Sequence, residues 1–134
     1  MRILEREGCS RTFDDYSHFC EMLLNRGVFK GRRILSEASI DQMTRKWVEI
    51  PESDGSNSND LSGCYYGFAY FVLRNPEMDR GNSKKGMFGW ARYNNTHFLI
   101  EPEKNLYGSF MTRSREFGWN IPITLRKTVN SIIE

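Results

Sequence analysis

Residues 88–113 read FGWARYNNTHFLIEPEKNLYGSFMTR and give the clearest indication of the fold. Its apolar segments are separated by two short turn signals, YNN (93–95) and PEKN (102–105). Asparagine tolerates a positive φ and proline fixes the φ of a turn, so both sequences are typical of tight connections between strands. Strands joined by such short turns pair antiparallel. The stretch therefore predicts an antiparallel meander of residues 87–92, 96–101 and 106–112.

The segments before this meander change from a helical to a strand period. Residues 65–73 (YYGFAYFVL) are nearly all apolar and rich in aromatics, which predicts a strand covered on both faces. Between residues 12 and 25 the apolar side chains instead recur with a helical period, and Thr12 and Gly27 suit the two caps of a helix. That helical stripe consists of Tyr16, Phe19, Cys20, Leu23 and Leu24.

A second helix is predicted after Ser36, which is a good N-cap residue. Its apolar face would consist of Ile40, Met43 and Trp47. The arm between the two helices is expected to bend at Lys30-Gly31. Residues 52–63 (ESDGSNSNDLSG) contain almost nothing that can be buried, so we expect a flexible surface loop there.

The chain closes with a helix that Pro122 can begin. Helices, then strands, then a helix is an order typical of an α+β domain. We therefore predict a single domain over residues 1–134, with an antiparallel sheet of three to five strands packed by helices. The apolar residues of the last helix that are expected to face this sheet are Ile123, Leu125, Val129, Ile132 and Ile133.

The composition excludes several function classes. The net charge is only +2 and the basic residues occur in isolated pairs, so we expect no nucleic-acid partner. No apolar run is long enough to predict a membrane span or a signal peptide. Three cysteines favour a reducing, cytoplasmic location, although part of a larger exported protein would show the same pattern. His18 and His97 lie in no metal-ligand spacing and are expected to be structural or exposed, and no cofactor motif is present.

Four segments, in the same order along the chain, match sequence motifs of one enzyme family. Residues 8–27 (GCSRTFDDYSHFCEMLLNRG) match an Asp-Tyr entry into a helix that ends Met-Leu-Leu-Asn, and residues 31–44 match the Ile-Leu-Ser…Met-Thr arm that follows it. Residues 65–73 match a Tyr-Gly-x-Gly-Phe strand, and residues 88–113 match a Gly-Trp-Gly-Gly…Asp-Pro…Phe-Met-Thr pattern. The chain thus resembles the C-terminal portion of class C β-lactamase-like and penicillin-binding-protein-like serine hydrolases.

This resemblance implies a partial β-lactamase/transpeptidase-like fold and acyl transfer on a serine. Members of the family use a Ser-x-x-Lys nucleophile motif, a Tyr-x-Asn motif and a Lys-Thr-Gly-like strand triplet to hydrolyse β-lactams, esters or D-peptides. The lysine is needed because a serine hydroxyl is a weak nucleophile at neutral pH. No serine of these 134 residues is followed three positions later by lysine, so we predict no catalytic residue.

The strand triplet is altered in this chain. It falls on Trp90-Ala91-Arg92, where arginine replaces the glycine that lets a strand run close beneath a substrate. These three residues are expected to be a vestigial active-site strand. Arg92 is expected to be a solvated side chain on the strand, with carboxylate binding as the alternative.

A Tyr-x-Asn sequence occurs once, as Tyr93-Asn94-Asn95, inside a predicted turn. Its place after the strand triplet favours a turn over a working base, because two asparagines suit a hairpin. Tyr93, Asn95 and Tyr66 remain candidate ligand-binding residues.

Three functions stay open at this point. The first is an inactive fragment or module of a β-lactamase-like hydrolase. The second is the C-terminal part of a working serine hydrolase that a missing N-terminal part completes. The third is a small-ligand or protein-binding module whose aromatic strands line a pocket.

The resemblance also implies that the strand Leu106–Thr112 pairs with an N-terminal strand of the family's fold. Without that neighbour its backbone groups need another partner. Three outcomes are open: an edge-to-edge homodimer, a strand donated by another protein, or residues 1–7 (MRILERE) folding back as a substitute strand. A homodimer or the substitute strand is favoured.

Overall fold

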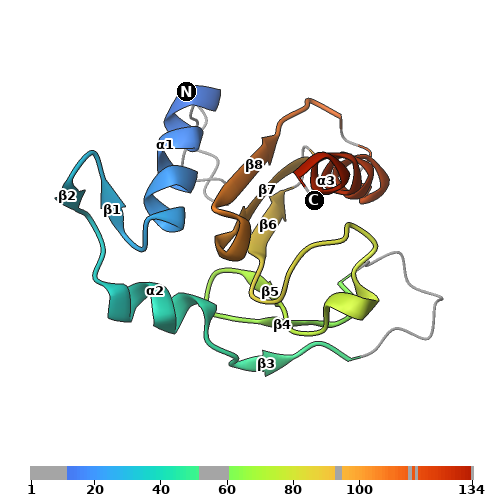
Figure 1. Cartoon of the computed structure of the whole chain (residues 1–134), viewed down its shortest axis with the longest axis horizontal. Helices are drawn as coiled ribbons and strands as arrows, with labels where there is room; N and C mark the ends of the chain where they lie inside the picture. The colour runs from blue at the N-terminus through green and yellow to red at the C-terminus, as the bar shows by residue number, and fades with distance from the viewer. Residues whose placement is uncertain (1–11, 52–60, 93–94, 115, 117, 134) are drawn as a thin grey trace, which may run out of the picture.

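The computed structural model describes residues 12–51, 61–92, 95–114, 116 and 118–133, with Arg92 described by its backbone alone. Most of the Ser/Asn loop predicted at residues 52–63 lies outside this description, as do residues 1–7. Within it, helices and antiparallel strands confirm the α+β class (Figure 1).

A six-stranded antiparallel sheet has the order β3-β4-β5-β6-β7-β8, so every strand lies beside its neighbour in the chain. Its three longest connected strands are the predicted meander: β6 (Phe88–Arg92), β7 (Thr96–Glu101) and β8 (Leu106–Phe110). Asn95 and Asn105, before β7 and β8, have φ values of 54° and 49°. The turns therefore use the positive φ that asparagine tolerates, as predicted.

The sheet has six strands, whereas the sequence predicts three to five. The predicted strand 65–73 is a hairpin of β4 (Cys64–Tyr66) and β5 (Phe71–Leu73), closed by a Gly67 N–H that donates to Tyr70 O at 2.8 Å. A Cβ on Gly67 would lie 2.1 Å from Met43 O, so only glycine permits this close turn. The sixth strand, β3 (Val48–Glu49), is a short edge strand that pairs with β4.

The first helix, α1 (Phe13–Leu24), agrees with its prediction, and the Thr12 hydroxyl accepts the Asp15 N–H at 3.2 Å. Its C-terminal cap differs by one position. Arg26 takes the left-handed conformation (φ 51°), while the Gly27 N–H donates to Met22 O, which completes a Schellman-type cap. Gly27 is still required, because a Cβ there would lie 2.2 Å from Leu35 O.

The second helix, α2 (Glu37–Thr44), begins at the predicted cap: the Ser36 hydroxyl accepts the Ser39 N–H. It ends before Trp47, so the prediction that Trp47 lies on the apolar face of this helix is wrong. Trp47 instead stacks on Phe68 of the β4–β5 turn at a centroid distance of 4.4 Å. Between α1 and α2, β1 (Val28–Phe29) and β2 (Arg32–Arg33) form a hairpin with the predicted bend between them.

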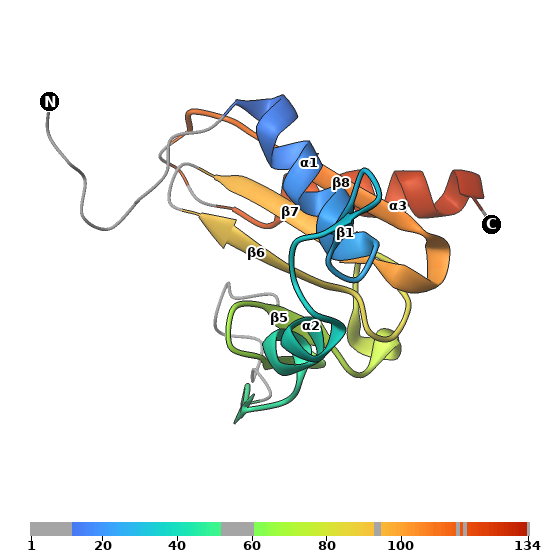
Figure 2. The ribbon, with the colours of Figure 1, turned by 90° about the vertical axis from the view of Figure 1, so that its left-hand side faces the viewer.

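The sheet is covered by helices on opposite faces (Figures 1 and 2). Phe98 and Ile100 of β7 belong to a core with Cys20 and Leu23 of α1. Leu99, between them in the strand, belongs to a second core with Trp119, which directly precedes α3 (Asn120–Ile133). We call these two sides the α1 face and the α3 face.

The orientation of α3 differs from the prediction. Of the five apolar residues expected to face the sheet, Ile123 is buried, whereas Leu125, Ile132 and Ile133 are 45%, 78% and 50% exposed. Arg126 and Asn130 lie on the inner side instead and hydrogen-bond to the loop before β6. Buried polar side chains with partners therefore set the rotation of this helix, which an apolar pattern cannot reveal.

Two short 3-10 helices complete the description. The first, Pro76–Met78, lies in the connection from β5 to β6, and the second, Pro102–Lys104, forms the β7–β8 turn. Within the described part of the chain, no helix combines the length and apolar character needed to cross a membrane.

Candidate functional site

The strand β6 presents the predicted triplet in register with β7. Trp90 lies opposite Phe98, and Ala91 lies opposite His97. The Trp90 ring is 39% exposed and lies 6.0 Å from the Tyr66 ring. The structure thus brings together two of the predicted site residues, Tyr66 and Trp90, from neighbouring parts of the sheet.

Two other predicted site residues cannot be placed. The side chain of Arg92 and the whole of Tyr93 lie outside the described residues. Carboxylate binding by Arg92 and ligand binding by Tyr93 therefore stay predictions.

Asn95 is buried and lies in the turn just before β7, where its hydrogen bonds are to residues other than Tyr66 and Trp90. Its Oδ1 lies 2.7 Å from His97 Nε2 and accepts the Gly118 N–H at 3.3 Å. Because an amide oxygen only accepts, the His97 Nε2 carries the proton of this pair. Asn95 thus joins β7 to the segment before α3, and a ligand-binding role for it stays a prediction.

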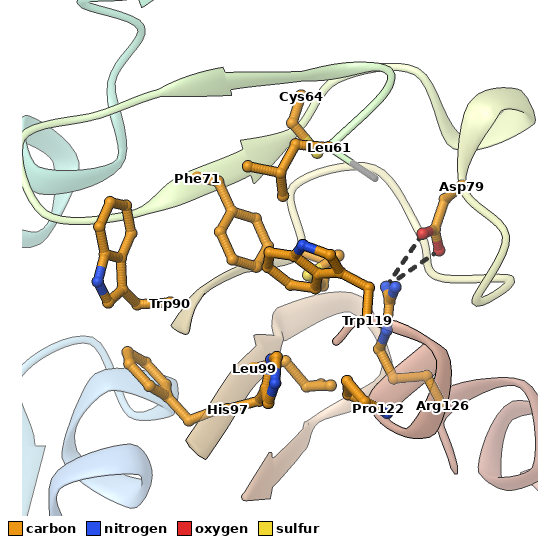
Figure 3. A pocket seen from close by; sticks show the side chains of 12 residues that line it. Leu61, Cys64, Phe71, Asp79, Trp90, His97, Leu99, Trp119, Pro122 and Arg126 are labelled. Carbon is orange, nitrogen blue, oxygen red and sulfur yellow. Dashed lines mark hydrogen bonds and ion pairs between the residues drawn. The ribbon is translucent and has the colours of Figure 1, made fainter. Parts of the chain in front are cut away.

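A small space lies between Trp90 and the amino end of α3 (Figure 3). Trp119 is one of the side chains that line it, with its ring 5.8 Å from the Phe71 ring and 5.1 Å from the His97 ring. The volume is about 30 Å³, which accommodates a water molecule but not an acyl substrate. This small space therefore belongs to the second core on the α3 face and is too small to be a substrate pocket.

His97 is the titratable group at the centre of this core. Burial, with a smaller effect of the Arg126 charge, lowers the pKa of His97 to about 4. The imidazole is therefore neutral at pH 7. Because Nε2 carries its proton and donates it to the Asn95 amide, Nε2 cannot act as a base, and this contact ties the imidazole to the turn before β7. The contact favours a structural histidine, which is one of the two predicted roles.

At the far end of the same core, Arg126 of α3 binds Asp79 (Figure 3). Its Nη1 donates to Asp79 Oδ1 at 3.1 Å, to Oδ2 at 3.2 Å and to Ser83 Oγ at 3.0 Å. The Asp79 side chain is 8% exposed and that of Arg126 is 12% exposed. An ion pair this buried and this well hydrogen-bonded is destabilising to break. It anchors the irregular connection between β5 and β6 to α3.

Two more buried polar side chains fix that connection. Asn130 Nδ2 donates to Gly81 O at 2.9 Å and Asn82 O at 3.1 Å. Glu101, at the end of β7, accepts the Lys84 N–H at 2.6 Å. Together with the Asp79–Arg126 pair, these contacts form what we call the α3 polar network.

Sequence reasoning did not find this network. Asp79 and Arg126 lie 47 positions apart, and no motif connects them. The alternation His97-Leu99-Glu101 along β7 is the available signal, because two polar residues share a strand face with a partly buried leucine.

Nucleophilic or metal chemistry finds no support among the described residues. No three or more His, Cys, Asp or Glu side chains there gather around a possible metal position. Burial raises the pKa of the Cys20 thiol to about 12, which keeps it protonated and unreactive. Cys20 is thus the small core residue that the sequence predicts.

The fold is similar to that of one solved structure in particular, the crystal structure of a novel penicillin-binding protein homologue from Caulobacter crescentus. The two superpose with a TM-score of 0.61 and 13% sequence identity, over 84% of this chain and 29% of that chain. No family model matches the chain, and neither does any curated protein. The chain therefore spans under a third of its structural neighbour and has a penicillin-binding-protein-like, β-lactamase/transpeptidase-like α+β fold.

Proposed function

We propose that these 134 residues form a β-lactamase-like module that does not carry out acyl transfer by itself. The observation that carries this proposal is the lack of any serine with a lysine three residues later, because acyl transfer needs a hydroxyl that a neighbouring base activates. The replacement of the family's glycine by Arg92 in the strand triplet also supports it.

The packing around Trp90 supports the same proposal. Trp119 lines the small space beside the triplet strand, and Asn95 is engaged by His97 and Gly118. A substrate carbonyl would need room and hydrogen-bond donors at the position where its oxyanion develops. The described contacts leave little of either beside Trp90.

The test is a hydrolysis assay on the full chain with nitrocefin and p-nitrophenyl acetate, together with labelling by a serine-directed phosphonate. We expect neither turnover above the buffer rate nor label. The matched variant Ala91→Gly/Arg92→Gly restores the Trp-Gly-Gly motif of esterase-like relatives. It should stay equally inactive, since it adds no nucleophile. Saturable turnover that disappears when one of the chain's own serines is replaced would refute the proposal.

A second candidate is the C-terminal part of a working serine hydrolase. It is favoured by the coverage of the structural neighbour, of which this chain matches 29%. The DNA upstream of Met1 tests it: an in-frame Ser-x-x-Lys followed by Tyr-x-Asn supports this candidate. Co-expression of that upstream segment with this chain should then produce hydrolysis that neither part shows alone.

A further inference from the structure

Among the described strands β8 lies at the edge of the sheet, and its own residues carry no device against further pairing. Within the described part of the sheet it hydrogen-bonds to β7 alone. Its sequence, LYGSF (Leu106–Phe110), contains neither a charge nor a proline. Natural edge strands usually carry lysine, proline or a bulge that prevents another strand from adding to them. This edge is therefore suited to pairing.

An apolar surface of α3 continues from this edge. Ile121, Leu125, Val129, Ile132 and Ile133 follow a helical period and form a stripe about 110° around the helix from its buried side. Leu125 and Val129 share a cavity of about 160 Å³ with Leu106, Gly108 and Phe110 of β8. Leu125 and Val129 of the stripe thus line this cavity together with residues of β8.

We propose that a second copy of this chain covers the surface, through antiparallel pairing of β8 with β8 of the partner copy about a two-fold axis at Gly108. In a continuous antiparallel sheet such an axis is perpendicular to the sheet, so both α3 helices lie on the same face. Each stripe then points toward the axis, where the other stripe lies. One operation therefore satisfies the backbone of both edges and covers both apolar stripes.

Charge complementarity favours a second copy over an unrelated strand. Glu103 precedes β8 and Arg113 follows it, and both are exposed. Pairing centred on Gly108 places residue 103 of one copy at the level of residue 113 of the other, twice by symmetry. Lys104, another cation beside the strand among the described residues, is largely buried and lies 3.9 Å from Glu101 Oε1. The two ends of β8 are thus complementary to each other in the antiparallel direction.

Sedimentation velocity of the full chain over a range of concentrations tests the proposal. We expect a monomer–dimer equilibrium, which Leu125→Glu weakens by about tenfold or more, as a charge in a buried interface should. The matched control is Ile34→Glu, since Ile34 is also an exposed apolar residue (59%, against 45% for Leu125) but lies between β2 and α2. It should leave the dissociation constant unchanged.

Charge reversal tests the register. Glu103→Arg alone and Arg113→Glu alone should each weaken the dimer several-fold, and the double variant should restore it, because only the double variant brings opposite charges together again. A monomer at every concentration, or a dimer that ignores both Leu125→Glu and the charge reversals, overturns the proposal. Sedimentation is independent of turnover, so this result and the hydrolysis assay fail or succeed separately.

Discussion

The two faces of the sheet are stabilised by different interactions. On the α1 face the Phe98 ring lies within 6.0 Å of the rings of Tyr16, Phe19 and Tyr70, and Cys20 and Ile100 are fully buried. On the α3 face the corresponding helix contacts the sheet and the β5–β6 connection partly through an ion pair and amide side chains.

This difference follows from what each face covers. The α1 face covers regular strands, whose backbone groups are satisfied within the sheet. The α3 face covers the irregular residues 74–87, whose carbonyl and N–H groups need side-chain partners when buried. The α1 face should therefore be sensitive to changes in side-chain volume and insensitive to pH, whereas the α3 face should also be sensitive to pH and to loss of charge.

The largest expected effect is on the α1 face. Phe98→Ala should lower the free energy of unfolding by about 4 kcal/mol, because it leaves a cavity among packed aromatic rings. Urea unfolding measures this loss. Phe68→Ala is the control, since Phe68 is 67% exposed and its truncation should cost less than about 1 kcal/mol. Similar losses for both variants would mean that the α1 face is loosely packed.

The next effect is on the α3 polar network. Arg126→Met should lower the free energy of unfolding by about 3 kcal/mol, because it leaves the Asp79 carboxylate buried without its cation. Arg74→Met removes an ion pair of similar length, 2.8 Å to Glu49, whose side chains are both 46% exposed. That control should lose at most about 1 kcal/mol. Equal losses would contradict the structural role of the buried pair.

His97 should make the α3 face sensitive to acid. Its folded pKa is about 4, whereas an unfolded histidine titrates near its ordinary value of about 6.5. Between these two pH values the unfolded state binds the extra proton, so stability falls as the pH falls and the loss is complete below pH 4. With allowance for solvent screening, His97 should account for roughly 2 kcal/mol of this loss.

Urea unfolding at a series of pH values, with His97→Gln, checks this. The variant keeps an N–H donor toward Asn95 and should lack this part of the pH dependence, while His18→Gln should retain it. An NMR titration that gives His97 a pKa near 6.5 would remove the basis of the prediction.

Much of this comparison could be derived from the sequence. The stripe Tyr16-Phe19-Cys20-Leu23 predicts the α1 face because apolar contacts leave a periodic pattern, and the asparagine turns predict the order of β6, β7 and β8. The hairpin at Gly67 was missed because its cause, the approach of Met43 O, is a tertiary contact. The rotation of α3 was missed for the same reason, since the partners of Arg126 and Asn130 lie more than 40 positions away.

The sequence predicts the part of the candidate site that lies on the single strand β6. The apolar segment and the turn signal at residues 93–95 predict a strand that contains Trp90 and Ala91, and Tyr66 joins Trp90 through the neighbouring hairpin. Trp119, which lines the space beside them, has no sequence signal of that role. Whether a site is open or packed depends on such distant side chains, so sequence motifs alone do not decide it.

The smallest expected loss of stability comes from a helix cap, which belongs to neither face of the sheet. Thr12→Ala removes the acceptor of the Asp15 N–H at the amino end of α1 and should lower the free energy of unfolding by about 1 kcal/mol. Thr12 is exposed and contributes no volume to the core, so Thr12→Ser, which keeps the hydroxyl, should lose little. The loss should also be the same at pH 7 and pH 5, because no titrating group is removed. A loss that grows with acid would mean that α1 and the α3 polar network are coupled through the sheet, and the two faces could then no longer be treated as independent.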